Sequence, residues 1–121
     1  MEGNSNKEKD LPTRAMADRY LRSYKKWNDM LLSSRRCTFE LGFDSSLDES
    51  VIQSELYSMR ALIVSIEDSQ QRMFLHLHYI KGVPVEKCTK ILDISRRTAF
   101  RVKNKALDSV ARLLKEKNID F

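Results

Sequence analysis

The sequence predicts an all-α fold, with a helical N-terminal hairpin followed by a helix-turn-helix. Gly and Pro are scarce, at three and two residues in 121, which favours long uninterrupted helices over a turn-rich β fold. Apolar residues recur at spacings of three and four in several stretches, as on the buried face of a helix. The tripeptide Asp93-Ile94-Ser95 then interrupts this pattern shortly before a strongly basic segment.

Residues 1–11 are polar and contain no apolar core, so we expect a disordered tail and no signal peptide. A first helix is predicted over residues 12–36, because Pro12 suits a helix start, where its missing N–H costs nothing. One apolar stripe follows, which is typical of a core or partner contact: Met16, Tyr20, Tyr24, Trp27 and Leu31.

A break is predicted from Cys37 to Leu47, where turn formers cluster around Gly42. Either aromatic side chains pin this loop, which we favour, or Thr38 to Phe43 forms a short extended piece. A second helix should begin at Ser46 or Leu47, since Ser46-Leu47-Asp48-Glu49 has the form of a capping box. Its heptad-like seam either packs on the first helix as an antiparallel hairpin or pairs with a second chain. The seam consists of Ile52, Leu56, Met59, Ile63 and Ile66.

A third helix is predicted from Asp68 to Gly82, with Asp68 as its N-cap and the side chain of Gln71 reaching back to it. Gly82 supplies the C-terminal stop. One face should carry Met73, Phe74, Leu77 and Ile80. His76 and His78 are two residues apart and point to different sides of a helix, so a shared metal ion is not expected.

The helix-turn-helix itself should begin at Pro84. The inward face of its short first helix is predicted to hold Val85, Cys88, Ile91 and Leu92. Asp93 stands where the backbone must be left-handed, which Asp tolerates better than most residues. Ile94 should pack between the two helices, and Ser95 should cap the next one through the N–H of Arg97 or Thr98.

The last helix divides into two faces. The buried face is predicted to hold Ala99, Val102, Ala106, Val110 and Leu113, and the opposite face Arg97, Phe100, Arg101, Asn104 and Asp108. Arg can grip guanine, Asn can read adenine, and an apolar ring can touch a thymine methyl group. The predicted base contacts are therefore Arg96, Arg97, Phe100, Arg101 and Asn104, and the predicted phosphate contacts are Ser95, Thr98, Lys103 and Lys105. The alternatives for Phe100, which we favour less than a base contact, are contact with a partner protein and local packing.

The net charge of +5 is concentrated in the C-terminal third. Residues 1–80 carry 11 Lys/Arg and 12 Asp/Glu, a net of −1, whereas residues 81–121 carry 11 and 5, a net of +6. Five cations and no acid lie between Arg96 and Lys105. This distribution favours a phosphate-bearing partner, double-stranded DNA above all.

The segment from about Ile66 to Leu114 resembles region four of the bacterial sigma factors, which reads the −35 promoter element. The matching motifs are His78-Tyr79-Ile80-Lys81-Gly82, Val85-Glu86-Lys87-Cys88, Ile91-Leu92-Asp93-Ile94-Ser95 and the run from Thr98 to Lys105-Ala106-Leu107. Short chains of this plan are similar to ArpU-type regulators of phages and prophages. Three positions depart from the pattern: Pro84, Thr89 and Asp93 stand where a Ser or Thr cap, a small Ala and a Gly are usual.

We therefore expect a cytoplasmic, sequence-specific DNA-binding transcription regulator with residues 12–66 as a dimer or partner region and residues 67–121 as the DNA-binding domain. The alternative is a module that binds RNA polymerase without reading DNA alone, through the two apolar stripes. An enzyme is not expected, since no phosphate-binding loop or nucleophile spacing is present. No cofactor or metal site is expected either, because Cys37 and Cys88 match no zinc spacing and read as reduced thiols. No apolar run approaches the ~20 residues of a membrane span.

Overall fold

The computed structural model describes residues 13–41 and 46–117, and all regular structure within them is helical. The elements are α2 (Arg14–Leu41), α3 (Ser46–Val64), α4 (Ser69–Leu75), a π-helical turn η1 (His76–Ile80), α5 (Val85–Leu92) and α6 (Arg96–Glu116). The predicted all-α class is confirmed. Within the described ranges, no helix combines the length and the apolar character that a membrane crossing requires.

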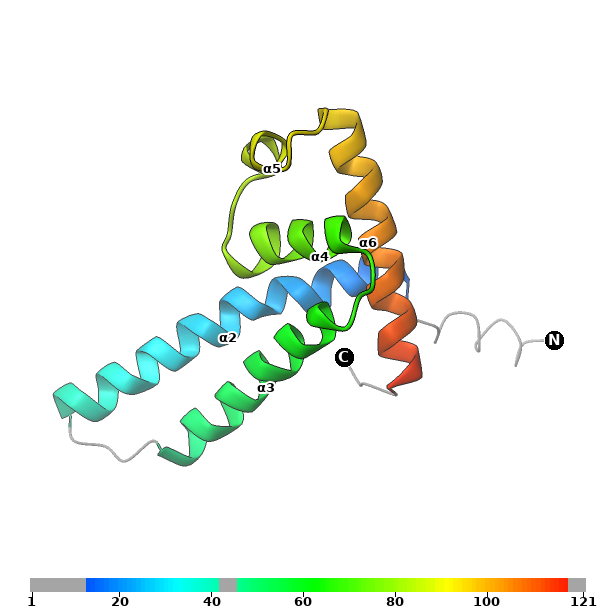
Figure 1. The fold of residues 1–121 in the computed structure, drawn as a ribbon. Coiled ribbons are helices and arrows are strands. Elements are labelled where there is room, and N and C mark those ends of the chain that lie inside the picture. The colour runs from blue at the N-terminus through cyan, green and yellow to red at the C-terminus, as the bar shows by residue number, and fades with distance from the viewer. Residues whose placement is uncertain (1–12, 42–45, 118–121) are drawn as a thin grey trace.

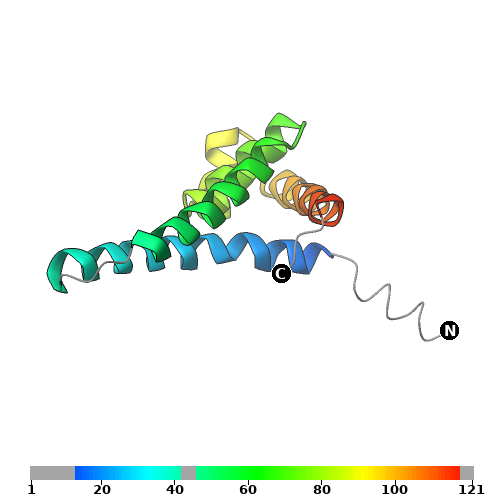
Figure 2. The ribbon, with the colours of Figure 1, turned by 90° about the horizontal axis from the view of Figure 1, so that it is seen from below.

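Helices α2 and α3 run antiparallel, and α6 crosses the beginning of α2 (Figure 1). Seen from below, α6 is nearly end-on beside the start of α2, and α3 passes in front of α4 (Figure 2). The main core joins all of these elements, because α2, α3, α4, η1 and α6 each contribute buried side chains to one cluster. The helical N-terminal region and the helix-turn-helix therefore share apolar packing.

The two predicted apolar stripes meet inside the chain. Tyr20, Tyr24 and Leu31 of α2 are buried, and Trp27 packs against the same cluster. Every member of the α3 seam is at most 5% exposed, from Ile52 to Ile66. Of the two arrangements left open by the sequence, the structure has the antiparallel hairpin.

Helix α2 starts one residue after Thr13, whose hydroxyl accepts the N–H of Met16 at 3.3 Å. The predicted break at Cys37 was wrong, because α2 continues to Leu41. No Gly or Pro lies in that interval, and Gly42 is the first helix-breaking residue that follows. The extended alternative for Thr38 to Leu41 is wrong for the same reason. Residues 42–45, which include Phe43, lie outside the described residues, and so does the predicted tail at residues 1–11. The predicted pinning of the loop by aromatic side chains concerns side chains that the structure does not describe.

The predicted start and stop of the third helix are confirmed, while two of its side chains differ from expectation. Asp68 accepts the N–H of Gln71 at 2.9 Å, and Gly82 ends the segment with φ of +72°. The amide of Gln71 does not reach back, because its Oε1 accepts the Ser109 hydroxyl of α6 at 2.8 Å. Met73 is 46% exposed, since the core side of this helix is taken by Phe74 and its neighbours.

Candidate nucleic-acid interface

Local chemistry builds the turn between α5 and α6. Pro84 has an extended backbone and its carbonyl accepts the N–H groups of Lys87 and Cys88, both at 3.0 Å. Asp93 is left-handed, with φ of 54° and ψ of 53°, as predicted. This conformation reverses the chain and lets the Ile94 N–H close α5 on the Thr89 carbonyl at 3.0 Å.

Ser95 caps α6 as predicted. Its Oγ accepts the Thr98 N–H at 3.1 Å and donates to Thr98 Oγ1 at 2.9 Å. Both hydroxyls proposed as phosphate contacts therefore have partners within the cap. The free N–H groups of the first turn of α6 still favour a negative charge at this end.

A second, smaller core holds α5 and α6 against α4. Its buried members are Phe74, Cys88, Ala99 and Val102, and Ile94 packs against them from the turn as predicted. Burial raises the pKa of the Cys88 thiol, so this cysteine stays a neutral packing residue. Ile91, predicted to face inward, is 57% exposed, because Cys88 and Leu92 already cover the contact that α5 makes.

The buried face of α6 is wider than predicted. It includes Leu107, Ser109, Ala111 and Leu114 beside four of the five expected residues, because the C-terminal half of the helix packs against α2 and α4 as well. The fifth expected residue, Leu113, is partly buried. Asp108, expected on the outward face, is exposed but paired. Its carboxylate accepts Nε and Nη2 of Arg14 at 3.0 Å each, and this pair raises the pKa of the Arg14 guanidinium.

The five predicted base-contact side chains are all exposed, and they lie in the first nine residues of α6. Arg97, Arg101 and Asn104 have no side-chain hydrogen bond or ion pair with the rest of the described chain. Arg96 differs, because its Cζ lies 5.7 Å from the Phe100 ring centroid and its Nη1 lies 3.7 Å from Glu86 Oε1. Phe100 is 40% exposed, so its ring is shared between Arg96 and solvent.

Of the cations proposed for phosphates, Lys105 is exposed and Lys103 is half-buried. Together with the arginines they give the free end of α6 a positive surface without a nearby acid on the same helix before Asp108. The arrangement can bind a polyanion and can present donors in the fork geometry that base edges accept.

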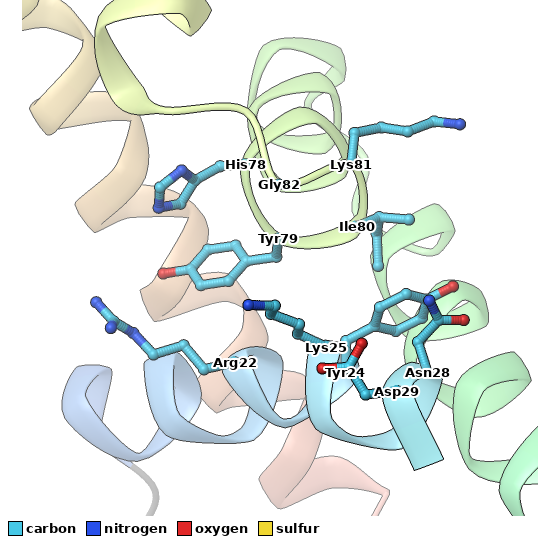
Figure 3. Close-up of a pocket in the computed structure, with 10 residues that line it drawn as sticks. All are labelled: Arg22, Tyr24, Lys25, Asn28, Asp29, His78, Tyr79, Ile80, Lys81 and Gly82. Atoms are coloured by element: carbon cyan, nitrogen blue, oxygen red, sulfur yellow. The ribbon is translucent and has the colours of Figure 1, made fainter. Parts of the chain in front are cut away.

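A cavity of about 540 Å³ lies between α2 and η1 (Figure 3). Lys25 extends from α2 beneath Tyr79, and Arg22 and Lys81 lie on opposite sides of Tyr79 (Figure 3). The phenol of Tyr79 donates to Asp18, which also accepts Arg22 Nε at 2.8 Å. Burial, and then this hydrogen bond, raises the pKa of Tyr79. The sequence offered no signal for the contact between Tyr79 and Asp18, since these two residues are 61 positions apart.

The two histidines lie in different surroundings. His76 is exposed, and His78 Nδ1 contacts the Val83 carbonyl at 2.9 Å. Across the described ranges, no three His, Cys, Asp or Glu side chains group closely enough to hold a metal ion.

One protein family matches residues 46–111, and it is described as "Protein of unknown function (DUF1492)". No curated protein and no solved structure matches the chain. The matched segment runs from the start of α3 to near the end of α6 and covers more than half of the chain. It therefore contains the whole of the α5–α6 turn and every exposed cation discussed above at the start of α6. The chain belongs to the DUF1492 family.

Proposed function

We propose that this protein is a sequence-specific DNA-binding transcription regulator that inserts the N-terminal half of α6 into the major groove. The observation that carries the proposal is the geometry of the α5–turn–α6 unit. A left-handed Asp93 and a capping Ser95 launch a helix whose first turns are exposed, basic and largely unpaired. A helix of this kind fits the major groove, which is about 12 Å wide.

Arg97, Arg101 and Asn104 are the side chains we assign to base edges, since each has donors with no partner in the described chain. Arg96 is assigned to the edge of this surface, because Glu86 and Phe100 already hold its guanidinium. Lys103 and Lys105 would contact phosphates. The resemblance to sigma region four and to ArpU-type phage regulators supports the same role and suggests a phage or prophage origin.

Selection of bound sites from random duplex DNA, followed by titration at several salt concentrations, tests the proposal. We expect log K to fall with log salt by about 0.9 per phosphate contact. Arg97→Ala and Arg101→Ala should each cost on the order of 1–3 kcal/mol at the selected site and relax sequence preference.

Arg112→Ala is the matched control, because Arg112 is an exposed arginine on the same helix but about two turns beyond Asn104, the last residue of the proposed reading surface. It should leave the sequence preference unchanged. Duplex binding that is undetectable, or that shows no dependence on salt, would contradict the proposal.

The alternative is a polymerase-binding module, and it relied on the α2 and α3 stripes as docking surfaces. Those stripes pack against each other, with Leu31 of the first 6% exposed and Met59 of the second 1% exposed. A polymerase contact would have to use another surface, so we favour direct DNA binding.

A further inference from the structure

The cavity between α2 and η1 has no part in the proposed reading of DNA. Helix α2 lies on the opposite side of α4 from α5 (Figure 1), so the cavity and the turn between α5 and α6 belong to different parts of the molecule. Its volume of about 540 Å³ is that of a small-molecule site, since such sites enclose roughly 300–1,000 Å³. The chemistry of its lining therefore indicates which kind of molecule fits.

One wall of the cavity is a π-helical turn, which is a rare structure in proteins. The turn η1 is closed by the N–H of Lys81, which donates to the His76 carbonyl, five residues back, at 3.0 Å. Such turns hold well under 1% of residues and occur frequently at functional sites. Here the turn brings the side chains of Tyr79 and Ile80 to the cavity, above α2 (Figure 3).

Three cations line the cavity, and two of them are unpaired. The side chains of Lys25 and Lys81 make no hydrogen bond or ion pair with any residue that the structure describes. Arg22 is held by Asp18, whose Oδ2 lies 2.8 Å from Nε, while its two Nη groups have no partner in the described ranges. Arg22 and Lys25 both extend beneath the Tyr79 ring (Figure 3). Guanidinium and ammonium groups placed in this way suit an anionic oxygen group.

Further along α2, the lining holds polar side chains without positive charge. They lie away from Arg22 and are Tyr24, Asn28 and Asp29 (Figure 3). The Tyr24 hydroxyl accepts Arg60 Nη1 at 2.9 Å, so its own proton is available to a ligand. The Asn28 amide can donate and accept, and the Asp29 carboxylate accepts from hydroxyls but repels anions. This end of the cavity therefore suits hydroxyl groups.

We propose that the cavity between α2 and η1 binds a small phosphate monoester that also carries hydroxyl groups, as sugar phosphates do. Its phosphate lies beneath the Tyr79 ring, between Arg22 and Lys25, with Lys81 at the rim of the cavity. Near pH 7 a phosphate monoester carries a charge of about −1.5 to −2 and three acceptor oxygens. These match a group of cations better than a carboxylate does, because a carboxylate has one charge and two oxygens.

The hydroxyl groups distinguish this ligand from a phosphate of the DNA backbone. A backbone phosphate carries a single negative charge, and the sugars within a DNA strand have no free hydroxyl, so Asn28 and Asp29 would gain no partner. A sugar phosphate uses both ends of the cavity, and Tyr79 and Ile80 cover the apolar side of its ring. The inference does not rest on the proposed function, because the ester and the duplex contact different residues.

Titration of the full chain with ribose 5-phosphate, glucose 6-phosphate and glycerol 3-phosphate, followed by amide NMR shifts, tests the inference. At least one ester should bind with a dissociation constant of about 1 mM or tighter, as expected for ligands of this size. The shifts should centre on Lys25, Tyr79 and Lys81. Inorganic phosphate and the matching unphosphorylated compound should each bind about ten-fold more weakly, because each uses only one end of the cavity.

Lys25→Gln should weaken binding of that ester by about ten-fold or more, because it removes an unpaired cation from the phosphate end. Lys26→Gln is the matched control, because Lys26 is the neighbouring exposed lysine of α2 and does not line this cavity. It should bind like the unmodified chain. Asn28→Ala should weaken binding of the ester and leave binding of inorganic phosphate unchanged. Lys25 and Asn28 are both exposed, so neither substitution opens the core.

The inference is overturned if none of the three esters binds saturably, if inorganic phosphate binds as tightly as the best ester, or if Lys25→Gln binds like the unmodified chain. It is also overturned if Lys25→Gln weakens binding of a DNA duplex and leaves binding of the ester unchanged, since the cavity is then a contact for the DNA backbone. Loss of duplex binding in Arg97→Ala bears on the proposed function alone.

Discussion

Leu21→Ala tests whether α2 and the helix-turn-helix unfold together. Leu21 is fully buried in the cluster that joins α2, α3, η1 and α6. Truncating such a leucine removes its transfer free energy and leaves a cavity, at a cost of about 3 kcal/mol. A chain of this size has about 5–15 kcal/mol of stability in total, so this loss should lower the midpoint of thermal unfolding by roughly 10 °C.

Because α2 and α6 share one core, the loss of stability should also destabilise α6, although the substitution is in α2. Urea unfolding followed by circular dichroism measures the total, and amide hydrogen exchange measures protection at Val102 and Ala106. Leu32→Ala is the control on the same helix, and its exposed side chain should cost less than about 0.5 kcal/mol. The reasoning is refuted if Leu21→Ala gives two separate transitions, or if protection in α6 stays at the level of the unmodified chain.

Two further predictions concern single hydrogen-bonding groups. Ser95→Ala should cost about 1 kcal/mol of unfolding free energy, because the Thr98 N–H loses its cap, whereas Ser58→Ala on the exposed side of α3 should cost almost nothing. Because the pKa of Tyr79 is raised, the folded chain holds the phenolic proton more tightly than the unfolded chain does. The contribution of this proton to the free energy of unfolding is complete below pH 10.0 and is lost as the pH rises above that value. Urea unfolding between pH 9 and 11 should show this decline, at up to about 1.4 kcal/mol per pH unit, and Tyr79→Phe should flatten it.

The parts of the fold that depend on local chemistry could be predicted from the sequence. Asp93 and Ser95 were assigned correctly because a left-handed residue and a cap are decided by backbone geometry over three or four residues. The two apolar stripes were found for a similar reason, since the period of a helix identifies its buried face. Gly82 was placed correctly because its positive φ suits few other residues.

The parts that depend on which element packs where could not be predicted. The exposure of Ile91 and Met73 is decided by neighbours that come from other helices. Helix periodicity identified the apolar seam of α3 but not the element that packs against it. That element is α2, and its position depends on the whole fold. The same holds for the candidate interface. The exposed side chains at the start of α6 could be identified from the sequence, because helix periodicity places them on one face. The ion pairs of Arg96 with Glu86 and of Asp108 with Arg14 could not, because each joins two separate helices.

The contact between the two ends of the described chain has a consequence for synthesis. Arg14 and Asp108 are 94 positions apart, and the core around them needs side chains from α6. A chain emerging from the ribosome can form the α2–α3 hairpin early, since both helices of the hairpin are synthesised before α6. The remaining apolar surface of α2 then stays open to solvent until α6 appears, several seconds later at about 5–20 residues per second. The nascent hairpin is therefore the species most exposed to aggregation and to chaperones, and the helix proposed to read DNA is also the one that completes the fold.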